Sequence, residues 1–389
     1  MRRVTPEERR NRLGARHRLS EPAADPAEVA RSLTGVHSTD PASMVLAMRR
    51  RLERPDVEAI EHALYGERTV VRILGMRRTV WVVPTELRPV VQAACTEALL
   101  PGERRKAVDM LEAAAVTPDG ENWLRETGEA ALSALRARGE ATAAELSEDV
   151  PAMRERILVA EGTKYEALQG MGPRVLFLLA AEGRIVRGRP LGSWTSTLYK
   201  WAPTEDWLGG EPDEMPVEEA RVTLVGSWLR SFGPGTFTDL KWWTGWPAGR
   251  LKKVLAALDV EEVELETGTG FVLADDAEPV ESPGPWAALL PALDPTVMGW
   301  SERGWYLGEH KASLFDRNGN AGPTVWWGGR IVGGWAQRSD GEIALRLLED
   351  PGTGARAAID QEAGSLEEWL GAVRFIPRFR TPLERELTA

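Results

Sequence analysis

The chain has 389 residues, too many for one hydrophobic core, so we expect about two to four modules. Its 43% hydrophobic and 28% charged residues are typical of a soluble globular protein, and a net charge of −11 argues against indiscriminate binding of polyanions. A single cysteine excludes an intrachain disulfide, and four histidines without paired ligand spacing predict neither a metal site nor a cofactor. With no signal peptide visible and no apolar run long enough to cross a bilayer, we expect a cytoplasmic location and no membrane contact.

The charge is distributed unevenly along the chain. Residues 1–20 contain seven arginines and only two glutamates, and they are predicted to form a basic N-terminal arm. Residues 259–281 contain nine acidic residues and no Lys or Arg. A local basic surface can therefore bind phosphates while acidic faces keep the protein soluble.

A helix is predicted to begin at Pro41, because apolar residues recur at helical spacing directly after it. Asp40 suits the N-cap, where its carboxylate can accept hydrogen bonds from free backbone N–H groups. His37, Ser38 and Thr39 then lie in a turn beside the positive end of the helix, where developing negative charge is favoured. The alternative is an ordinary helix entry with a histidine facing solvent.

A helix followed by two short strands recurs three times, which is typical of the winged form of helix-turn-helix. The first predicted unit is a helix at 57–65 with strands at 69–74 and 79–83. The second is a helix at 174–181 with a strand beginning at 184–186 and a basic turn at 187–190. The third has helices at 218–232 and 248–258 with strands at 260–266 and 271–274. Thr142 and Glu145 have the spacing of a capping box and predict another helix start. Residues 208–216, which are acidic and rich in Gly and Pro, are predicted to be a linker.

From residue 286 onward, short apolar runs alternate with glycine-rich turns, which predicts a compact β-barrel or sandwich. The runs expected to be strands are 298–300, 305–308, 324–327, 331–335 and 343–348, and a final helix is expected at 366–373. The many tryptophans of this part are expected to form its core. A basic tail follows, with Arg374, Arg378 and Arg380.

The predicted fold class is therefore α+β, with three tandem winged-helix modules followed by a C-terminal β-barrel. The expected boundaries are 1–20 for the basic arm, 21–118, 119–207 and 208–285 for the three winged-helix modules, and 286–389 for the barrel and tail.

Five segments are similar to those of the bacterial winged-helix DNA glycosylases of the AlkZ and YcaQ type. The segments are 37–51, 69–84, 183–201, 239–246 (Asp-Leu-Lys-Trp-Trp-Thr-Gly-Trp) and 318–335, which contains Thr-Val-Trp-Trp-Gly-Gly-Arg-Ile-Val-Gly-Gly-Trp. The resemblance covers nearly the whole chain, and its last two segments are the most specific.

This resemblance implies modules arranged around a DNA-sized channel. It also implies removal of bulky alkylated purines, including interstrand crosslinks, in DNA repair or in self-resistance to genotoxic natural products. The implied partner is double-stranded DNA carrying alkylated purines, bound by a monomeric, nucleoid-associated protein without a cofactor.

The family signature is Gln–apolar–Gln or Gln–apolar–Asp, followed by Asp-Pro. At the matching place this chain has His37-Ser38-Thr39, followed by Asp40-Pro41, so both signature glutamines are replaced. The resemblance assigns His37, Thr39 and Asp40 as the catalytic residues. A neutral imidazole could place a water and accept its proton, the Thr39 hydroxyl could hold that water, and Asp40 could orient His37 or stabilise a sugar cation.

Basic residues in or near the wings are the candidates for phosphate contacts: Arg77, Arg78, Arg187, Arg189 and Lys241. The alternative for each is a solvated side chain at a wing tip.

Two other functions stay open at this stage. The loss of both glutamines is compatible with a non-catalytic winged-helix DNA-binding protein that kept the scaffold. The tryptophan-rich C-terminal half could instead form a ligand cleft in a drug-sequestering protein.

Overall fold

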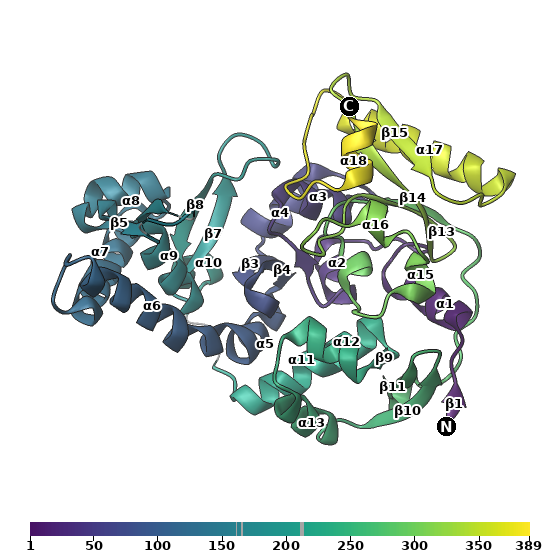
Figure 1. Cartoon of the computed structure of the whole chain (residues 1–389), viewed down its shortest axis with the longest axis horizontal. Helices are drawn as coiled ribbons and strands as arrows, with labels where there is room; N and C mark the ends of the chain where they lie inside the picture. The colour runs from purple at the N-terminus through teal and green to yellow at the C-terminus, as the bar shows by residue number, and fades with distance from the viewer. Residues whose placement is uncertain (161, 165, 211–213) are drawn as a thin grey trace. The chain divides into compact units, whose positions relative to one another are not determined.

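The structure is a computed structural model that describes residues 1–160, 162–164, 166–210 and 214–389 (Figure 1). Part of the predicted linker, residues 211–213, lies outside the described residues. The chain divides into two compact units. Unit 1 contains Met1–Val70, Trp81–Pro84 and Arg221–Ala389, and unit 2 contains Val71–Val80 and Thr85–Ala220. Within the described ranges, no helix is both long and apolar enough to span a membrane.

Unit 1 combines helices with two four-stranded sheets. Its elements, in chain order, are β1 (Arg2–Arg3), α1 (Pro6–Arg16), α2 (Pro26–Ser32), β2 (Val36–His37), α3 (Pro41–Arg49), α4 (Val57–Tyr65), β4 (Val80–Pro84), α11 (Val217–Phe232), β9 (Gly235–Thr236), α12 (Phe237–Thr244), α13 (Ala248–Ala256), β10 (Val260–Leu265), β11 (Gly268–Leu273), β12 (Ala287–Leu290), α14 (Pro295–Met298), α15 (Gly304–Leu307), α16 (Lys311–Leu314), β13 (Thr324–Trp327), β14 (Arg330–Gln337), β15 (Ile343–Leu347), α17 (Thr353–Leu370) and α18 (Pro382–Leu387).

The C-terminal strands form an antiparallel sheet in the order β12-β13-β14-β15. Among the described strands, β12 and β15 are the two edges of this sheet, so it is open and does not close into the predicted barrel. Two of the five expected strands are absent: 298–300 begins at the last residue of helix α14, and most of 305–308 belongs to helix α15. Helix α17 packs against β12, β13 and β15, and Figure 1 shows it beside this sheet.

The tryptophans of unit 1 form its core, as the sequence predicted. Trp300, Trp326 and Trp335 are almost fully buried, and so are Trp228 and Trp243 from α11 and α12. Edge-to-face and stacked aromatic pairs of this kind add to the free energy gained from burying their area. The aromatic side chains therefore join the helices of residues 217–244 to the C-terminal sheet.

The segment predicted as a basic arm, residues 1–20, is folded into unit 1. Strand β1 pairs in parallel with β10, Arg2 lying opposite Val263. Arg12 is buried and bonds to Glu8 and Asp276, and Arg16 also bonds to Asp276. These arginines hold α1 against the acidic strand region of residues 259–281.

Unit 2 is mainly helical, and its described residues include two short antiparallel pairs of strands. Its elements are β3 (Val70–Leu74), a 3-10 turn (Met76–Arg78), a second (Thr85–Leu87), α5 (Arg88–Val91), a π-helical turn (Gln92–Thr96), a third 3-10 turn (Glu97–Leu99), α6 (Leu100–Ala113), α7 (Gly120–Arg138), α8 (Ala143–Asp149), a fourth 3-10 turn (Pro151–Arg154), β5 (Arg156–Val159), β6 (Ala167–Gly170), α9 (Gly172–Ala181), β7 (Ile185–Pro190), β8 (Tyr199–Pro203) and α10 (Thr204–Leu208). One apolar cluster forms its core, with members from Ala107 on α6 to Trp201 on β8.

Local signals placed several elements of both units correctly. Helix α4 has the predicted bounds 57–65, and α8 begins with the predicted capping box, in which the Glu145 amide donates to Thr142 Oγ1 at 3.2 Å. The predicted basic turn at 187–190 is wrong, because these residues continue strand β7 and Arg187 pairs with Trp201 of β8.

Candidate active site

The backbone of the candidate catalytic segment is fixed by a strand pair inside unit 1. Val36 and His37 form β2, which runs antiparallel to β4 with His37 opposite Trp81. Gly35, just before β2, has a φ of +119°, and a Cβ added there would lie 3.0 Å from Val83 Cγ1. Only glycine fits this position without strain, so Gly35 sets the path of the chain into His37.

His37 and Thr39 are brought together at the start of helix α3. Thr39 Oγ1 lies 3.4 Å from His37 Nε2, at the long end of hydrogen-bond distances. His37 is 8% exposed, and its ring meets the Trp81 ring edge-on with centroids 5.2 Å apart. The indole thus fixes the imidazole from one side, while Thr39 is only partly buried. An imidazole nitrogen and a hydroxyl at this spacing could share one water molecule.

Asp40 precedes helix α3 at the predicted N-cap position, but its side chain makes no capping hydrogen bond. Its carboxylate instead accepts a hydrogen bond from Ser43 Oγ at 2.7 Å. The Asp40 residue is 6% exposed, and this burial raises its pKa above the ordinary value, while the Ser43 hydroxyl acts in the opposite direction. The predicted capping bond is therefore not formed, although the backbone N–H groups of Ala42 and Arg378 and the charge of Arg378 also act to lower the pKa of the Asp40 carboxyl.

Three neighbours of this segment were not predicted as site residues. Ser43 could have been found from its place one helical turn after Asp40, and Arg378 belongs to the basic tail noted in the sequence. Arg378 Nη1 lies 3.5 Å from the Thr39 carbonyl oxygen. Trp81 carries no local signal, since it reaches His37 only through strand pairing.

The first pair of predicted phosphate contacts, Arg77 and Arg78, lies in the 3-10 turn of unit 2. Both residues have positive φ, 52° and 60°. The Arg78 guanidinium bonds to Glu103 Oε2 at 2.7 Å and lies over the Phe177 ring. Arg78 is therefore partly neutralised by the protein itself.

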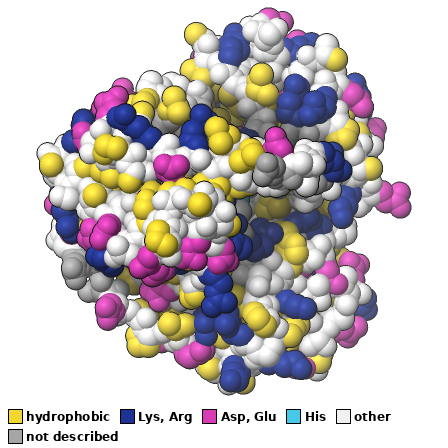
Figure 2. All heavy atoms as spheres, turned by 60° about the vertical axis from the view of Figure 1, so that its left-hand side comes forward, with side chains coloured by type: hydrophobic (Ala, Val, Ile, Leu, Met, Phe, Trp, Pro, Cys, Tyr) yellow, Lys and Arg dark blue, Asp and Glu magenta, His cyan; other side chains and the backbone are white. Residues whose placement is uncertain are grey.

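The other candidates differ in exposure. Arg187 of β7 lies over the Tyr199 ring, with Cζ 4.4 Å from the ring centre, and so points toward protein atoms. Arg189, two residues further on, is exposed, and Lys241 of α12 is exposed in unit 1. Figure 2 shows Lys and Arg side chains in several separate groups on one face, with Asp and Glu between them.

The described residues contain no cluster of three His, Cys, Asp or Glu side chains arranged to hold a metal ion. The chemistry that this segment can offer is thus an imidazole, a hydroxyl and a nearly buried carboxyl at the mouth of a helix.

Comparisons with known proteins give two findings. A family profile described as "DNA glycosylase AlkZ-like" matches residues 30–369. Among solved structures, the Streptomyces sahachiroi DNA glycosylase AlkZ is similar with a TM-score of 0.72 and 21% identity, over 96% of this chain and 98% of that one. No match was found among curated proteins. The mixed α+β fold described above is thus shared along almost the full length of both chains.

Proposed function

Because the chain belongs to the AlkZ-like family of DNA glycosylases, we propose that it hydrolyses the N-glycosidic bond of bulky N7-alkylated purines in duplex DNA. The proposal includes interstrand crosslinks among the substrates, and a role in DNA repair or in self-resistance to a genotoxic natural product. It also assigns DNA binding to tandem winged-helix modules of a cytoplasmic, monomeric protein.

The observation that carries the proposal is the pairing of His37 Nε2 with Thr39 Oγ1, 3.4 Å apart, at the place of the family signature. N7-alkylation leaves a fixed positive charge on the purine, so the base departs without being protonated. The enzyme then has to place a water at the anomeric carbon and stabilise positive charge on the sugar. His37 and Thr39 hold that water in the proposed mechanism, and His37 accepts its proton.

Asp40 has the electrostatic role in this mechanism. Asp40 directly follows Thr39 in the chain, its carboxylate supplies a negative charge in the proposed mechanism, and Ser43 fixes the orientation of that carboxylate. A nearly buried carboxylate stabilises a developing sugar cation more strongly than an exposed one, because less solvent screens it.

Base release from DNA carrying N7-methylguanine and from DNA carrying a bulky N7 adduct tests the proposal. We expect His37→Ala to slow single-turnover release at least about 100-fold, as for loss of a general base. The variant His37→Gln restores the amide of the family signature and is expected to stay within about tenfold of the wild type. Thr39→Val removes the hydroxyl at nearly constant volume and should give an intermediate loss.

Equal release by the wild type and His37→Ala, at equal melting temperatures, would rule out this role of His37. A non-catalytic DNA-binding function is the second candidate, favoured by the replacement of both signature glutamines. Salt-dependent binding of duplex DNA without release of any adduct, by the wild type and by His37→Gln alike, would support that function instead.

A further inference from the structure

Unit 2 contains a cavity of about 620 Å³ that the catalytic proposal does not use. This volume lies within the 300–1,000 Å³ that is usual for small-molecule sites. The cavity is bounded by β3 and α5 on one side and by α9, β7, β8 and the start of α8 on the other. All of its lining residues belong to unit 2.

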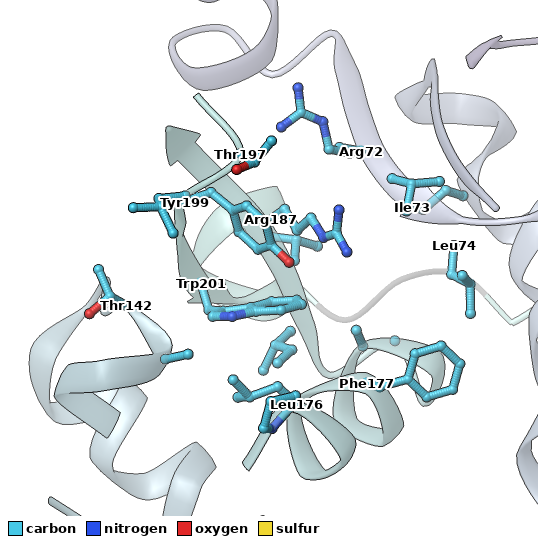
Figure 3. A pocket seen from close by; sticks show the side chains of 18 of the residues that line it. Arg72, Ile73, Leu74, Thr142, Leu176, Phe177, Arg187, Thr197, Tyr199 and Trp201 are labelled. Atoms are coloured by element: carbon cyan, nitrogen blue, oxygen red, sulfur yellow. The ribbon is translucent and has the colours of Figure 1, made fainter. Parts of the chain in front are cut away.

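The walls of the cavity are mainly apolar and aromatic. In Figure 3, Leu176 and Phe177 lie at one end, and the Tyr199 and Trp201 rings stand above them. The Tyr199 and Trp201 rings meet edge to face, with centroids 5.2 Å apart. Aromatic rings in the lining of a cavity favour a ligand that is itself flat and apolar over most of its area.

Two arginines bring buried charge to this apolar lining. Arg72 is 5% exposed, and no hydrogen-bond partner for its Nε is found among the described residues. Arg88 is 2% exposed; its Nη2 donates to the Gly183 carbonyl at 3.0 Å, whereas its Nη1 has no partner in the described chain. Burial lowers the pKa of Arg88 to about 10, so this guanidinium is still protonated at neutral pH.

No carboxylate compensates these charges within the cavity. The described lining residues include Arg72 and Arg88 but no Asp or Glu. A buried cation with unsatisfied N–H groups is costly unless an anion or another acceptor reaches it. Arg72 Nε and Arg88 Nη1 are thus two buried donors without an acceptor among the described residues.

The mouth of the cavity is open to solvent and apolar. Leu191 and Leu198, which line it, are 40% and 66% exposed. The Leu191 amide donates to the Leu198 carbonyl at 2.8 Å, so the two residues form a backbone-paired rim. Exposed leucines at the mouth of an apolar cavity would be covered by a ligand that extends beyond it.

We propose that this cavity binds a small, flat, largely apolar molecule that carries one anionic group. The anionic group lies against Arg72, the apolar body lies along Phe177, Tyr199 and Trp201, and Arg88 adds a second positive charge to the same lining. The lining of this cavity shares no residue with the His37 segment, and its occupancy does not require glycosylase activity.

Two fluorescent naphthalene probes that differ by one sulfonate test the proposal on the full chain without DNA. We expect 8-anilinonaphthalene-1-sulfonate to bind saturably at one site, about tenfold more tightly than the neutral N-phenyl-1-naphthylamine, because a charged hydrogen bond is gained. Arg72→Met should abolish this preference and leave the neutral probe bound as before. Ala180→Phe, which fills the cavity from α9, should weaken both probes.

Arg125→Met is the matched control, because it removes the same charge from an exposed site on α7 of the same unit. Equal affinity for the two probes, or an equal loss in Arg72→Met and Arg125→Met, would overturn the proposal. So would competitive displacement of the sulfonate probe by undamaged duplex DNA, which would make the cavity part of a DNA interface. Loss of the preference for the sulfonate probe in Arg72→Met supports the proposal only if this variant unfolds at the same temperature as the wild type. Arg88→Met, which removes the other buried charge of the lining, is the second test of that preference.

Discussion

Asp40 connects the proposed chemistry of single residues to the stability of unit 1. Its pKa is raised chiefly by burial, which disfavours the charged form, and is lowered in part by the Ser43 hydroxyl. A raised pKa in the folded state means that folding is favoured most when Asp40 is protonated, below its ordinary pKa of 3.8. This stability is lost as the pH rises through the raised value, so at neutral pH the charged Asp40 destabilises the fold.

Asp40→Asn is therefore expected to be more stable than the wild type at pH 7–8, because the neutral amide can still accept from Ser43 and carries no buried charge. The advantage should shrink as the pH falls toward 4, where the wild-type carboxyl is protonated in the folded state. Base release should fall about 10- to 100-fold, since the charge facing the sugar cation is lost. Urea unfolding across this pH range and single-turnover release measure the two effects.

Asp119→Asn is the control for this prediction, because Asp119 is an exposed N-cap of α7 and Asn caps helices equally well. A variant Asp40→Asn that is less stable than the wild type at pH 7–8 would contradict the assigned cost of the buried charge. Unchanged base release would remove Asp40 from the mechanism.

At the scale of elements, prediction from sequence worked where the signal was local. The bounds of α4 and the capping box of α8 follow from neighbouring residues. The predicted strand 298–300 instead begins at the last residue of α14, a helix whose start has the same Asp-Pro pair as the start of α3. The strand predicted for β7 was too short for a different reason. Trp201, which pairs with Arg187, is fourteen residues away in the sequence, and no local pattern indicates this pairing.

The candidate site shows the same limit. The segment 37–40 could be located from its sequence, because the helix start and the similarity to the family signature coincide there. Trp81 and Arg378 reach it from β4 and the C-terminal tail, and only the tertiary fold brings them close. The buried charges of the unit 2 cavity were also hidden, since Arg72 lies in a strand that otherwise contains only apolar residues.

A buried ion pair joins Arg51, which follows helix α3, to Asp294, the N-cap of helix α14, and this contact supports a prediction of stability. Arg51 donates to both oxygens of Asp294, at 2.8 and 2.7 Å, and both side chains are fully buried. We expect Asp294→Ala to lower the free energy of unfolding by about 3–5 kcal/mol, because it leaves the Arg51 charge buried and unpaired. Urea denaturation followed by tryptophan fluorescence measures this loss.

The matched control is Asp275→Ala, which breaks the exposed pair between Arg230 and Asp275, 2.8 Å long. Its expected cost is below about 1 kcal/mol, because solvent screens both charges. Similar losses for the two variants would show that burial does not decide the strength of the Arg51–Asp294 pair.

At the scale of the whole molecule, the fold is compatible with DNA binding despite the charge of −11. Many arginines are used inside the protein, such as Arg12 and Arg16 against Asp276 and Arg51 against Asp294. On the face that Figure 2 shows, the exposed basic residues lie in separate groups. Only a small number of phosphate contacts is therefore expected, and each should contribute visibly to the salt dependence of binding.

Arg189→Ala and Lys241→Ala test this expectation, since both side chains are exposed and were predicted to contact phosphates. Each variant should weaken binding of duplex DNA and reduce the slope of log K against log salt concentration by about one, the effect of one lost phosphate contact. Arg78→Ala should change the slope less, because Glu103 already neutralises part of its charge.

Fluorescence anisotropy between about 50 and 200 mM salt measures the slopes, with Arg125→Ala as the control for a change in net charge. If Arg125→Ala lowers the slope as much as Arg189→Ala and Lys241→Ala, the effect comes from overall charge, and neither residue contacts the backbone of DNA.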